Sequence, residues 1–445
     1  MASRGWMTLV ALLALCLHAC DGESTPDAGR GGRDGGTAGI DGGDADAGSV
    51  GADAGELPAD LLAIDDLRYV GAFRIDERMF GSSSVDYATG ALGYSPDHHS
   101  LYVAGFRPEA MVGEFAIPDP LGTGMTVAEL PNVDTALQAF QPILDRAADG
   151  NPESLDTVTG MLWVDGDLIV NGNVWYDADG GTRDTTIVVR GGQLDGTVDG
   201  YFELEGAAWV AGYMAWLPDE WRTAFGAPAL VGWASNYSIV SRYSVGPTLF
   251  TFDPEALVAA GAGTDVATTM HLGFPYSDGV YLAPDALDYQ CDVLADMVTT
   301  ECQPGAMASD LWNFVSRGVY GFVVPGTRTF AVFGSLGGSR SGLGYKITRS
   351  DGNLCGGPCA YDPDDYDNYY WFFDVDAILG ASSPSEPRPY AWGAWSVPFD
   401  ADGSHEILGG AFAPDTGILY LSLSHAGQVG TYDRPPLIVA FDVSR

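Results

Sequence analysis

The stretch Gly409 to Leu421 reads G-G-A-F-A-P-D-T-G-I-L-Y-L, and after a loop Pro436 to Val443 reads P-L-I-V-A-F-D-V. Short apolar runs flank the turn-forming residues Pro414 to Gly417, a pattern that predicts two strands joined by a tight turn. A third strand is predicted at Leu437 to Val443. The three strands make a β-meander, which is the unit that organises the rest of the chain.

The same unit recurs upstream with interruptions, and self-similarity of this kind is typical of repeat folds. Gly90 to Phe106, G-A-L-G-Y-S-P-D-H-H-S-L-Y-V-A-G-F, is the best match. Three more copies begin at Gly160, Gly212 and Gly318, and Gly409 opens the fifth. One additional strand is expected before each copy, at Leu67 to Ile75, Met125 to Leu130, Val198 to Leu204, Ala267 to Phe274 and Pro389 to Pro398.

Five units of four strands, with almost no helical periodicity, predict an all-β fold, a β-propeller of five four-stranded blades. We expect the strand Leu67 to Ile75 to close the ring against the last blade, which would remove open sheet edges. A β-sandwich followed by a second β-domain is the structural alternative.

The N-terminal segment has the features of a targeting signal. Arg4 precedes an apolar run, Met7 to Leu17, that is too short to span a bilayer. Leu17-His18-Ala19-Cys20 resembles the lipobox of bacterial lipoproteins, although His18 stands where a small residue or Ser/Thr is usual. The resemblance implies cleavage before Cys20 and lipidation of that cysteine. An ordinary secretory signal cleaved nearby is the alternative.

Three segments follow from this pattern: a signal peptide at 1–19, a tether at 20–60 and the propeller at 61–445, with insertions at about 275–317 and 335–368. The tether is rich in Gly, Ala and Asp and has no apolar face to bury, so we expect it to be disordered. The resulting expectation is a lipid-anchored protein of the cell envelope, on an outer membrane and facing the periplasm or the surface.

The chain is strongly acidic, with 20 Lys and Arg against 60 Asp and Glu and a formal net charge of −40. Nucleic acids and anionic lipid surfaces require clustered cations, so this balance disfavours both as partners. Apart from the membrane anchor, the expected partners are a glycan, a peptide or another protein. Calcium is the one cofactor that the acidic composition suggests.

Four cysteines remain beyond the N-terminal segment, and all lie in the two insertions. An even number in an exported chain predicts two disulfides, and pairing by neighbours joins Cys291 to Cys302 and Cys355 to Cys359. A four-cysteine zinc site is the alternative, which the wide first spacing and the oxidising compartment disfavour.

The channel rim is the main candidate site. In a propeller the first strand of each blade lies nearest the axis, so residues just before these strands should surround the channel mouth. Those residues are Asp86, Asp156, Glu205, Asn313, Arg317, His405 and Glu406. A ring of carboxylates here could bind calcium or support glycosidic cleavage. Acidic residues are also common in loops generally, so an ordinary polar surface is the alternative.

The acidic stretch D-P-D-D-Y-D-N-Y-Y-W, Asp362 to Trp371, is a second candidate. Its aspartates offer oxygen ligands, but their spacing is not that of an EF-hand, and a solvated loop is the alternative. The chain lacks the nucleophile-elbow, zinc-protease, phosphate-loop and dinucleotide-binding motifs. Two hypotheses follow: an envelope-anchored binding propeller, and an envelope hydrolase of glycosidic or phosphoester bonds that uses the rim carboxylates.

Overall fold

The computed structural model describes residues 57–175, 177, 181–233, 244–283, 308–345, 347–401 and 403–444. All of them belong to one unit, which spans residues 48–445. The signal, Cys20, the tether up to residue 56, and the predicted pair Cys291 and Cys302 lie outside the described residues, so these remain predictions.

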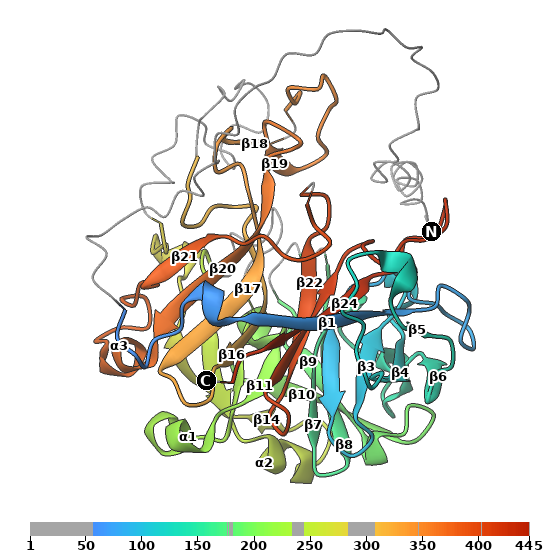
Figure 1. The fold of residues 1–445 in the computed structure, drawn as a ribbon. Coiled ribbons are helices and arrows are strands. Elements are labelled where there is room, and N and C mark those ends of the chain that lie inside the picture. Colours follow the sequence, from blue (N-terminus) through green and yellow to red (C-terminus); the bar gives the residue numbers. More distant parts are fainter. Residues whose placement is uncertain are drawn as a thin grey trace, which may run out of the picture. The chain divides into compact units, whose positions relative to one another are not determined.

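Five sheets, antiparallel except at one short parallel pairing in each of two blades, form a ring, a five-bladed β-propeller (Figure 1). Blade A contains β22 (Ile407–Ala413), β23 (Ile418–Leu423), β24 (Leu437–Asp442), β1 (Arg68–Ile75) and β5 (Asn132–Val133). Blade B contains β2 (Leu92–Ser95), β3 (Ser100–Ala104), β4 (Val112–Ala116) and β6 (Gln138–Gln141). The strands of each blade are given in order from the channel axis outward.

Blade C contains β7 (Thr157–Val164), β8 (Asp167–Asn173), β9 (Asp184–Val189), β10 (Val198–Leu204) and β14 (Asp265–Val266). Blade D contains β11 (Met214–Trp216), β12 (Ala229–Val231), β13 (Leu249–Phe252) and β15 (Thr269–Leu272). Blade E contains β16 (Arg317–Val323), β17 (Thr329–Gly337), β20 (Tyr366–Asp374) and β21 (Ala391–Ala394). The propeller prediction, with its five units, is therefore confirmed.

The innermost strands contact one another in a closed cycle, β22 to β2, β7, β11, β16 and back to β22. Glycines that open some of the units explain how close these strands come. A Cβ atom on Gly160 would collide with the carbonyl oxygen of Gly212, and one on Gly409 would collide with that of Gly90. Glycine is therefore needed where two inner strands meet. The apolar core lies between adjacent blades, in clusters that combine residues of two or more sheets.

The predicted closing strand is confirmed, because β1 pairs antiparallel with β24, from Arg68 opposite Asp442 to Arg74 opposite Leu437. The strand predicted at Met125 to Leu130 is wrong. That segment forms a 3-10 turn, η3 (Val127–Glu129), and the outer strand of blade B is β6 instead. The apolar residues of the segment alternate as in a strand, but Leu130 packs into the core beside β1 and does not pair with β4.

A meander places its connections alternately at the two ends of each blade. The rim end carries the segments that precede each innermost strand and the connections from second to third strands. The turn end carries the connections between first and second strands, which are short turns in four blades and contain a helix in blade D. The hairpin of β18 (Leu343–Tyr345) and β19 (Pro358–Ala360) lies at the end opposite α1 (Asp219–Phe225) and α2 (Pro254–Ala259), whereas α3 (Val375–Gly380) follows β20 (Figure 1).

The disulfide Cys355–Cys359 is present in the insertion between β17 and β20, as predicted. None of the helices in the described part of the chain has the length and apolar run needed to cross a membrane.

Candidate functional site

An ion pair joins two of the predicted rim residues across adjacent blades. Arg317 is the first residue of β16 and Glu406 directly precedes β22, so ring closure brings them together, with Nη1 3.2 Å from Oε2. Both side chains are about two-thirds buried. The Nε atom of Arg317 is buried and has no hydrogen-bond partner among the described residues. The pair therefore retains an unused donor beside a carboxylate.

His405 and Ser424 hold the Glu406 segment in place. The Nδ1 atom of His405 lies 2.8 Å from the carbonyl oxygen of Ser424. A carbonyl can only accept, so the Nδ1 atom donates in this hydrogen bond. The hydroxyl of Ser424 accepts the backbone N–H of Glu406 at 2.8 Å.

The next residue, His425, extends this cluster toward blade B. Burial, with the nearby positive charge of Arg434, lowers the pKa of His425, so its ring is neutral near pH 7. The ring of Tyr87 meets it edge-on, with centroids 5.5 Å apart. Tyr87 is 48% exposed, which is unusual for so large an aromatic residue.

Asp86, another predicted rim residue, is half-buried beside Tyr87. Its carboxylate accepts the backbone N–H of Arg434, and the backbone N–H of Tyr87 donates to the Arg434 carbonyl at 3.2 Å. Burial raises the pKa of Asp86, and the negative charges of Asp433 and Glu77 raise it further. These bonds join the segment before β2 to the connection before β24.

Asp156 lies on blade C at the same end. Its exposed carboxylate accepts the hydroxyl of Thr157 at 2.8 Å and the backbone N–H of Trp175 at 2.9 Å. The guanidinium of Arg107 lies 4.6 Å from the centroid of the Trp175 ring, a cation–π geometry. The backbone N–H of Arg107 in turn donates to the Tyr87 carbonyl at 3.3 Å.

These contacts run continuously around part of the channel mouth, from blade E through A and B to C. We call this set the rim arc. It consists of Arg317, Glu406, His405, His425, Asp86, Tyr87, Arg107, Trp175 and Asp156. Five of the predicted rim residues belong to it.

Glu205 and Asn313 lie elsewhere. Glu205 follows β10, and its backbone N–H donates to Val266 of β14, which places it at the exposed outer edge of blade C. The turn η6 (Ala207–Val210) separates it from β11. Asn313 is buried and its side chain is used within the fold, where it donates to the Gly337 carbonyl at 2.7 Å and accepts the Val315 N–H.

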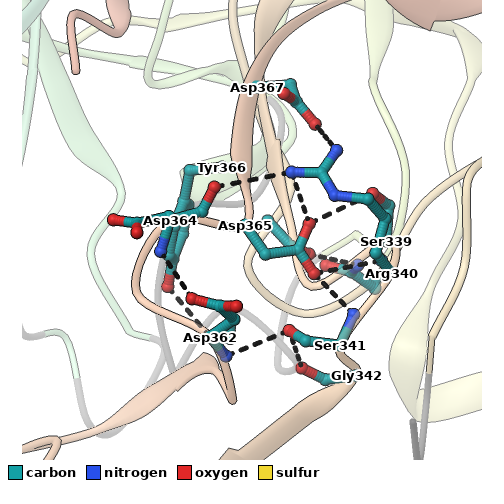
Figure 2. Close-up of polar contacts among 12 residues, drawn as sticks. Ser339, Arg340, Ser341, Gly342, Asp362, Asp364, Asp365, Tyr366 and Asp367 are labelled. Carbon is teal, nitrogen blue, oxygen red and sulfur yellow. Dashed lines mark hydrogen bonds and ion pairs between the residues drawn. The ribbon is translucent and has the colours of Figure 1, made fainter. Parts of the chain in front are cut away.

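The acidic stretch that begins at Asp362 is organised by internal bonds (Figure 2). Asp365 is 2% exposed and accepts the backbone N–H groups of Arg340 and Ser341, at 3.0 and 2.6 Å. The Arg340 guanidinium pairs with Asp365 at 3.1 Å and with Asp367 at 2.6 Å. Asp362 accepts the backbone N–H of Asp364. These carboxylates fasten the insertion between β17 and β20.

In the part of the chain that the structure describes, no three His, Cys, Asp or Glu side chains lie close enough to hold a metal ion. Calcium at the rim stays a prediction. Glu406 is paired with Arg317, and Glu205 lies at the outer edge of its blade.

Sequence reasoning missed Tyr87, Arg107, Trp175 and His425, the aromatic and cationic members of the arc. Three of them lie in or beside connections between second and third strands, at Arg107, Trp175 and His425. A meander brings these connections to the same end as the segments that precede the innermost strands. Counting strands within each predicted unit would therefore have pointed to them.

Comparison with protein-family models and with curated protein sequences finds no match. Among solved structures, one is described as showing that the GH130 family of mannoside phosphorylases contains glycoside hydrolases targeting β-1,2-mannosidic linkages in Candida mannan. It is 11% identical with a TM-score of 0.39, and the match covers 83% of this chain and 94% of that chain.

A second solved structure is a candidate oxidoreductase (glucose dehydrogenase) from Thermus thermophilus. It is 14% identical with a TM-score of 0.30, and the match covers 84% of this chain and 99% of that chain. Both TM-scores are below 0.5, so neither likeness bears on the function of this chain.

Proposed function

We propose that this propeller is a glycan-binding protein of the cell envelope, which binds its ligand at the rim arc and is held at a membrane by lipid on Cys20. One observation carries the proposal. The arc alternates aromatic rings with charged groups that both donate and accept hydrogen bonds. Sugars present apolar C–H faces between hydroxyls, and such an arrangement suits both features.

The pair of Arg317 and Glu406 supplies the polar contacts. Each side chain of the pair is about one-third exposed, so one sugar hydroxyl can donate to the Glu406 carboxylate while its neighbour accepts from the exposed part of the Arg317 guanidinium. Hydrogen bonds to charged groups are worth about 1.5–3 kcal/mol each, so two of them would fix the orientation of a sugar ring.

Exposed aromatic residues at the same end supply the apolar contacts. Tyr87 is 48% exposed, and Tyr432, in the connection that carries Asp433 and Arg434, is 86% exposed. Large exposed aromatic surfaces of this kind mark interaction sites more often than single aliphatic side chains do. Charges of both signs occur along the arc, which favours an uncharged ligand over a strongly charged one.

The anchor follows from the lipobox resemblance of Leu17-His18-Ala19-Cys20. Replacing Cys20 with alanine should move the protein to the soluble fraction and abolish labelling by a fatty-acid analogue. Unchanged membrane partition in the Cys20→Ala variant would contradict the anchor and would leave the ligand proposal untouched.

The hydrolase alternative has one supporting observation. A general acid requires a raised pKa, and burial raises the pKa of Asp86. The Asp86 carboxylate is, however, occupied by the backbone N–H of Arg434. Incubation of bound oligosaccharides with wild type and Asp86→Asn, followed by an assay for new reducing ends, decides between binding and cleavage.

The binding proposal is tested by screening the propeller against an array of neutral and acidic oligosaccharides and measuring affinity for the hits by calorimetry. Arg317→Gln should weaken binding at least tenfold, about 1.4 kcal/mol. Arg183→Gln is the matched control, because it breaks an exposed ion pair with Glu203 of β10 that is not part of the rim arc. Absence of any glycan ligand, or equal losses in both variants, would contradict the proposal; a peptide hit in a parallel screen would replace the ligand class.

A further inference from the structure

The turn end of the channel contains a cavity of its own. Its volume is about 240 Å³, and all five blades contribute to its lining. The walls are largely apolar, and they include the aromatic side chains of Tyr94, Trp163, Trp216, Tyr320 and Phe412. A cavity of this size is smaller than a drug-sized pocket, and it suits a ligand of a few non-hydrogen atoms.

The cavity is closed toward the rim end. Toward the rim end, the channel holds a second, smaller space with a volume of about 10 Å³. Met161, Met214 and Tyr320 line both this space and the cavity. That space is about the size of a single water molecule. The backbone N–H of Phe412 donates to the Tyr320 hydroxyl at 2.8 Å, which holds the floor in place. A ligand in this cavity is therefore separate from one at the rim arc.

The charged residues that line the cavity are both acidic. Asp97 lies in the turn between β2 and β3, and Asp165 lies in the turn between β7 and β8, and both are exposed. A third carboxylate, that of Asp415, accepts the Tyr94 hydroxyl at 2.8 Å just beyond the wall. The described lining residues include no Lys, Arg or His.

The basic side chains beside the cavity each have a partner, and the Nδ1 atom of His99 lies 3.2 Å from the hydroxyl of the lining residue Tyr94. Arg222 lies over the Trp216 ring, 5.8 Å from its centroid, and pairs with Asp219 at 2.8 Å. The Nδ1 atom of His98 lies 2.8 Å from the buried carboxylate of Glu114. The field at the cavity mouth is therefore negative, and it opposes the approach of an anion.

We propose that the turn-end cavity binds a small organic cation, whose alkylammonium group sits among the aromatic walls with Asp97 and Asp165 at its mouth. Aromatic rings attract cations through their quadrupoles, most strongly where water is excluded. The two carboxylates add attraction and raise the local concentration of cations. An apolar wall combined with an acidic mouth is the combination that a methylated or primary ammonium group needs.

Choline is the probe, and 3,3-dimethylbutan-1-ol, which has the same shape without the charge, is its control. Calorimetry with the folded propeller should show choline binding at least tenfold tighter than the neutral alcohol. Asp97→Asn with Asp165→Asn should reduce choline affinity at least tenfold. Asp195→Asn, an exposed carboxylate in the connection between β9 and β10 that does not line the cavity, should leave it unchanged.

Two results would overturn the proposal. Equal affinity for choline and the neutral alcohol would make the cavity a purely apolar pocket, and binding of neither would remove it as a site for small cations. Circular dichroism of the double variant shows whether a loss of affinity reflects unfolding. Arg317→Gln should leave choline binding intact, so this proposal and the glycan proposal fail independently.

Discussion

The two ends of one channel differ in how they are built. The rim end is assembled from long connections that side-chain bonds hold in place, such as Arg317 to Glu406 and Asp365 to the Arg340 segment. The turn end is assembled mainly from tight turns, which the strand ladders position directly, although α1 joins the first two strands of blade D. His99 and Asp165 take positive φ values of 46° and 45° in these turns. The repeated meander thus supplies a common frame, and the length of the connections decides the chemistry of each end.

Charge separates the two ends as well. The rim arc mixes Arg317 and Arg107 with carboxylates, whereas the charged residues that line the turn-end cavity are Asp97 and Asp165. A propeller of this kind can therefore present two ligand classes on opposite sides of a closed floor. If the two ends are independent, a substitution at one end should change ligand binding there and leave binding at the other end unchanged.

The largest effect is expected for Asp365→Asn. The buried carboxylate accepts two backbone N–H groups and pairs with Arg340, so its loss should lower the free energy of unfolding by about 3 kcal/mol. Because the insertion it fastens lies at the rim end, glycan affinity should fall while choline affinity is unchanged. Urea unfolding and the two titrations measure this.

Asp364→Asn is the matched control in the same loop, since the hydrogen bonds of Asp364 to Asp362 and Arg340 are made by its backbone atoms. It should alter neither stability nor either affinity. An equal decrease in glycan affinity and choline affinity in Asp365→Asn would show that the two ends are coupled.

Gly410→Ala in β22 should cost less stability than Asp365→Asn, and it should weaken binding at the turn end instead of the rim end. The new Cβ would lie 2.9 Å from ring atoms of Tyr320, which must move, at a cost of about 1–3 kcal/mol in stability. Because Tyr320 forms the floor of the turn-end cavity, choline binding should weaken and glycan binding should not. Gly393→Ala, whose Cβ would have no neighbour nearer than 3.6 Å, is the control for the substitution itself.

The smallest effect concerns pH at the rim end. The folded pKa of His425 lies below its ordinary value of 6.5, so the unfolded chain binds that proton first as pH falls. Stability should therefore decline as pH falls below about 6.5, and less so in His425→Asn. Asparagine suits the position because φ is 56° there. Thermal unfolding from pH 8 to 5 measures the slope.

His271 in blade D contributes with the same sign, because burial lowers its pKa to about 4. The relevant quantity is therefore the difference in stability between wild type and His425→Asn at each pH. A difference that is constant across the range, and does not grow below about pH 6.5, would contradict a role for His425 titration.

The sequence predicted the blades well because inner strands need both apolar residues and glycine. Gly160 and Gly409 open their units at points where inner strands touch. Because glycine is required there, it recurs at the start of these units and can be recognised from a single sequence. The outer strand β6 was missed because Phe140 is its sole fully buried side chain, so the stretch Q-A-F-Q has no strand-like pattern.

The site was predictable only in part. The positions of Arg317 and Glu406 within their repeats correctly predicted that both lie at the starts of innermost strands. These strands are neighbours because the blades follow one another around the ring in the order of the sequence. It misplaced Glu205, since the turn η6 separates that residue from β11. Contacts such as Arg107 with Trp175 join connections of different blades, and their lengths carry no periodic signal.

The pairing of β1 with β24 also sets the order of assembly. Arg68 and Asp442, partners in this ladder, are 374 residues apart in sequence. Bringing ends so distant together from a flexible chain costs about 5 kcal/mol of closure entropy. During synthesis the first strand can pair early only with β5, and its edge toward β24 must wait until the last blade has left the ribosome. Ring closure is thus the final step of folding, and until it occurs blade A exposes the edge of β24 to any other strand nearby.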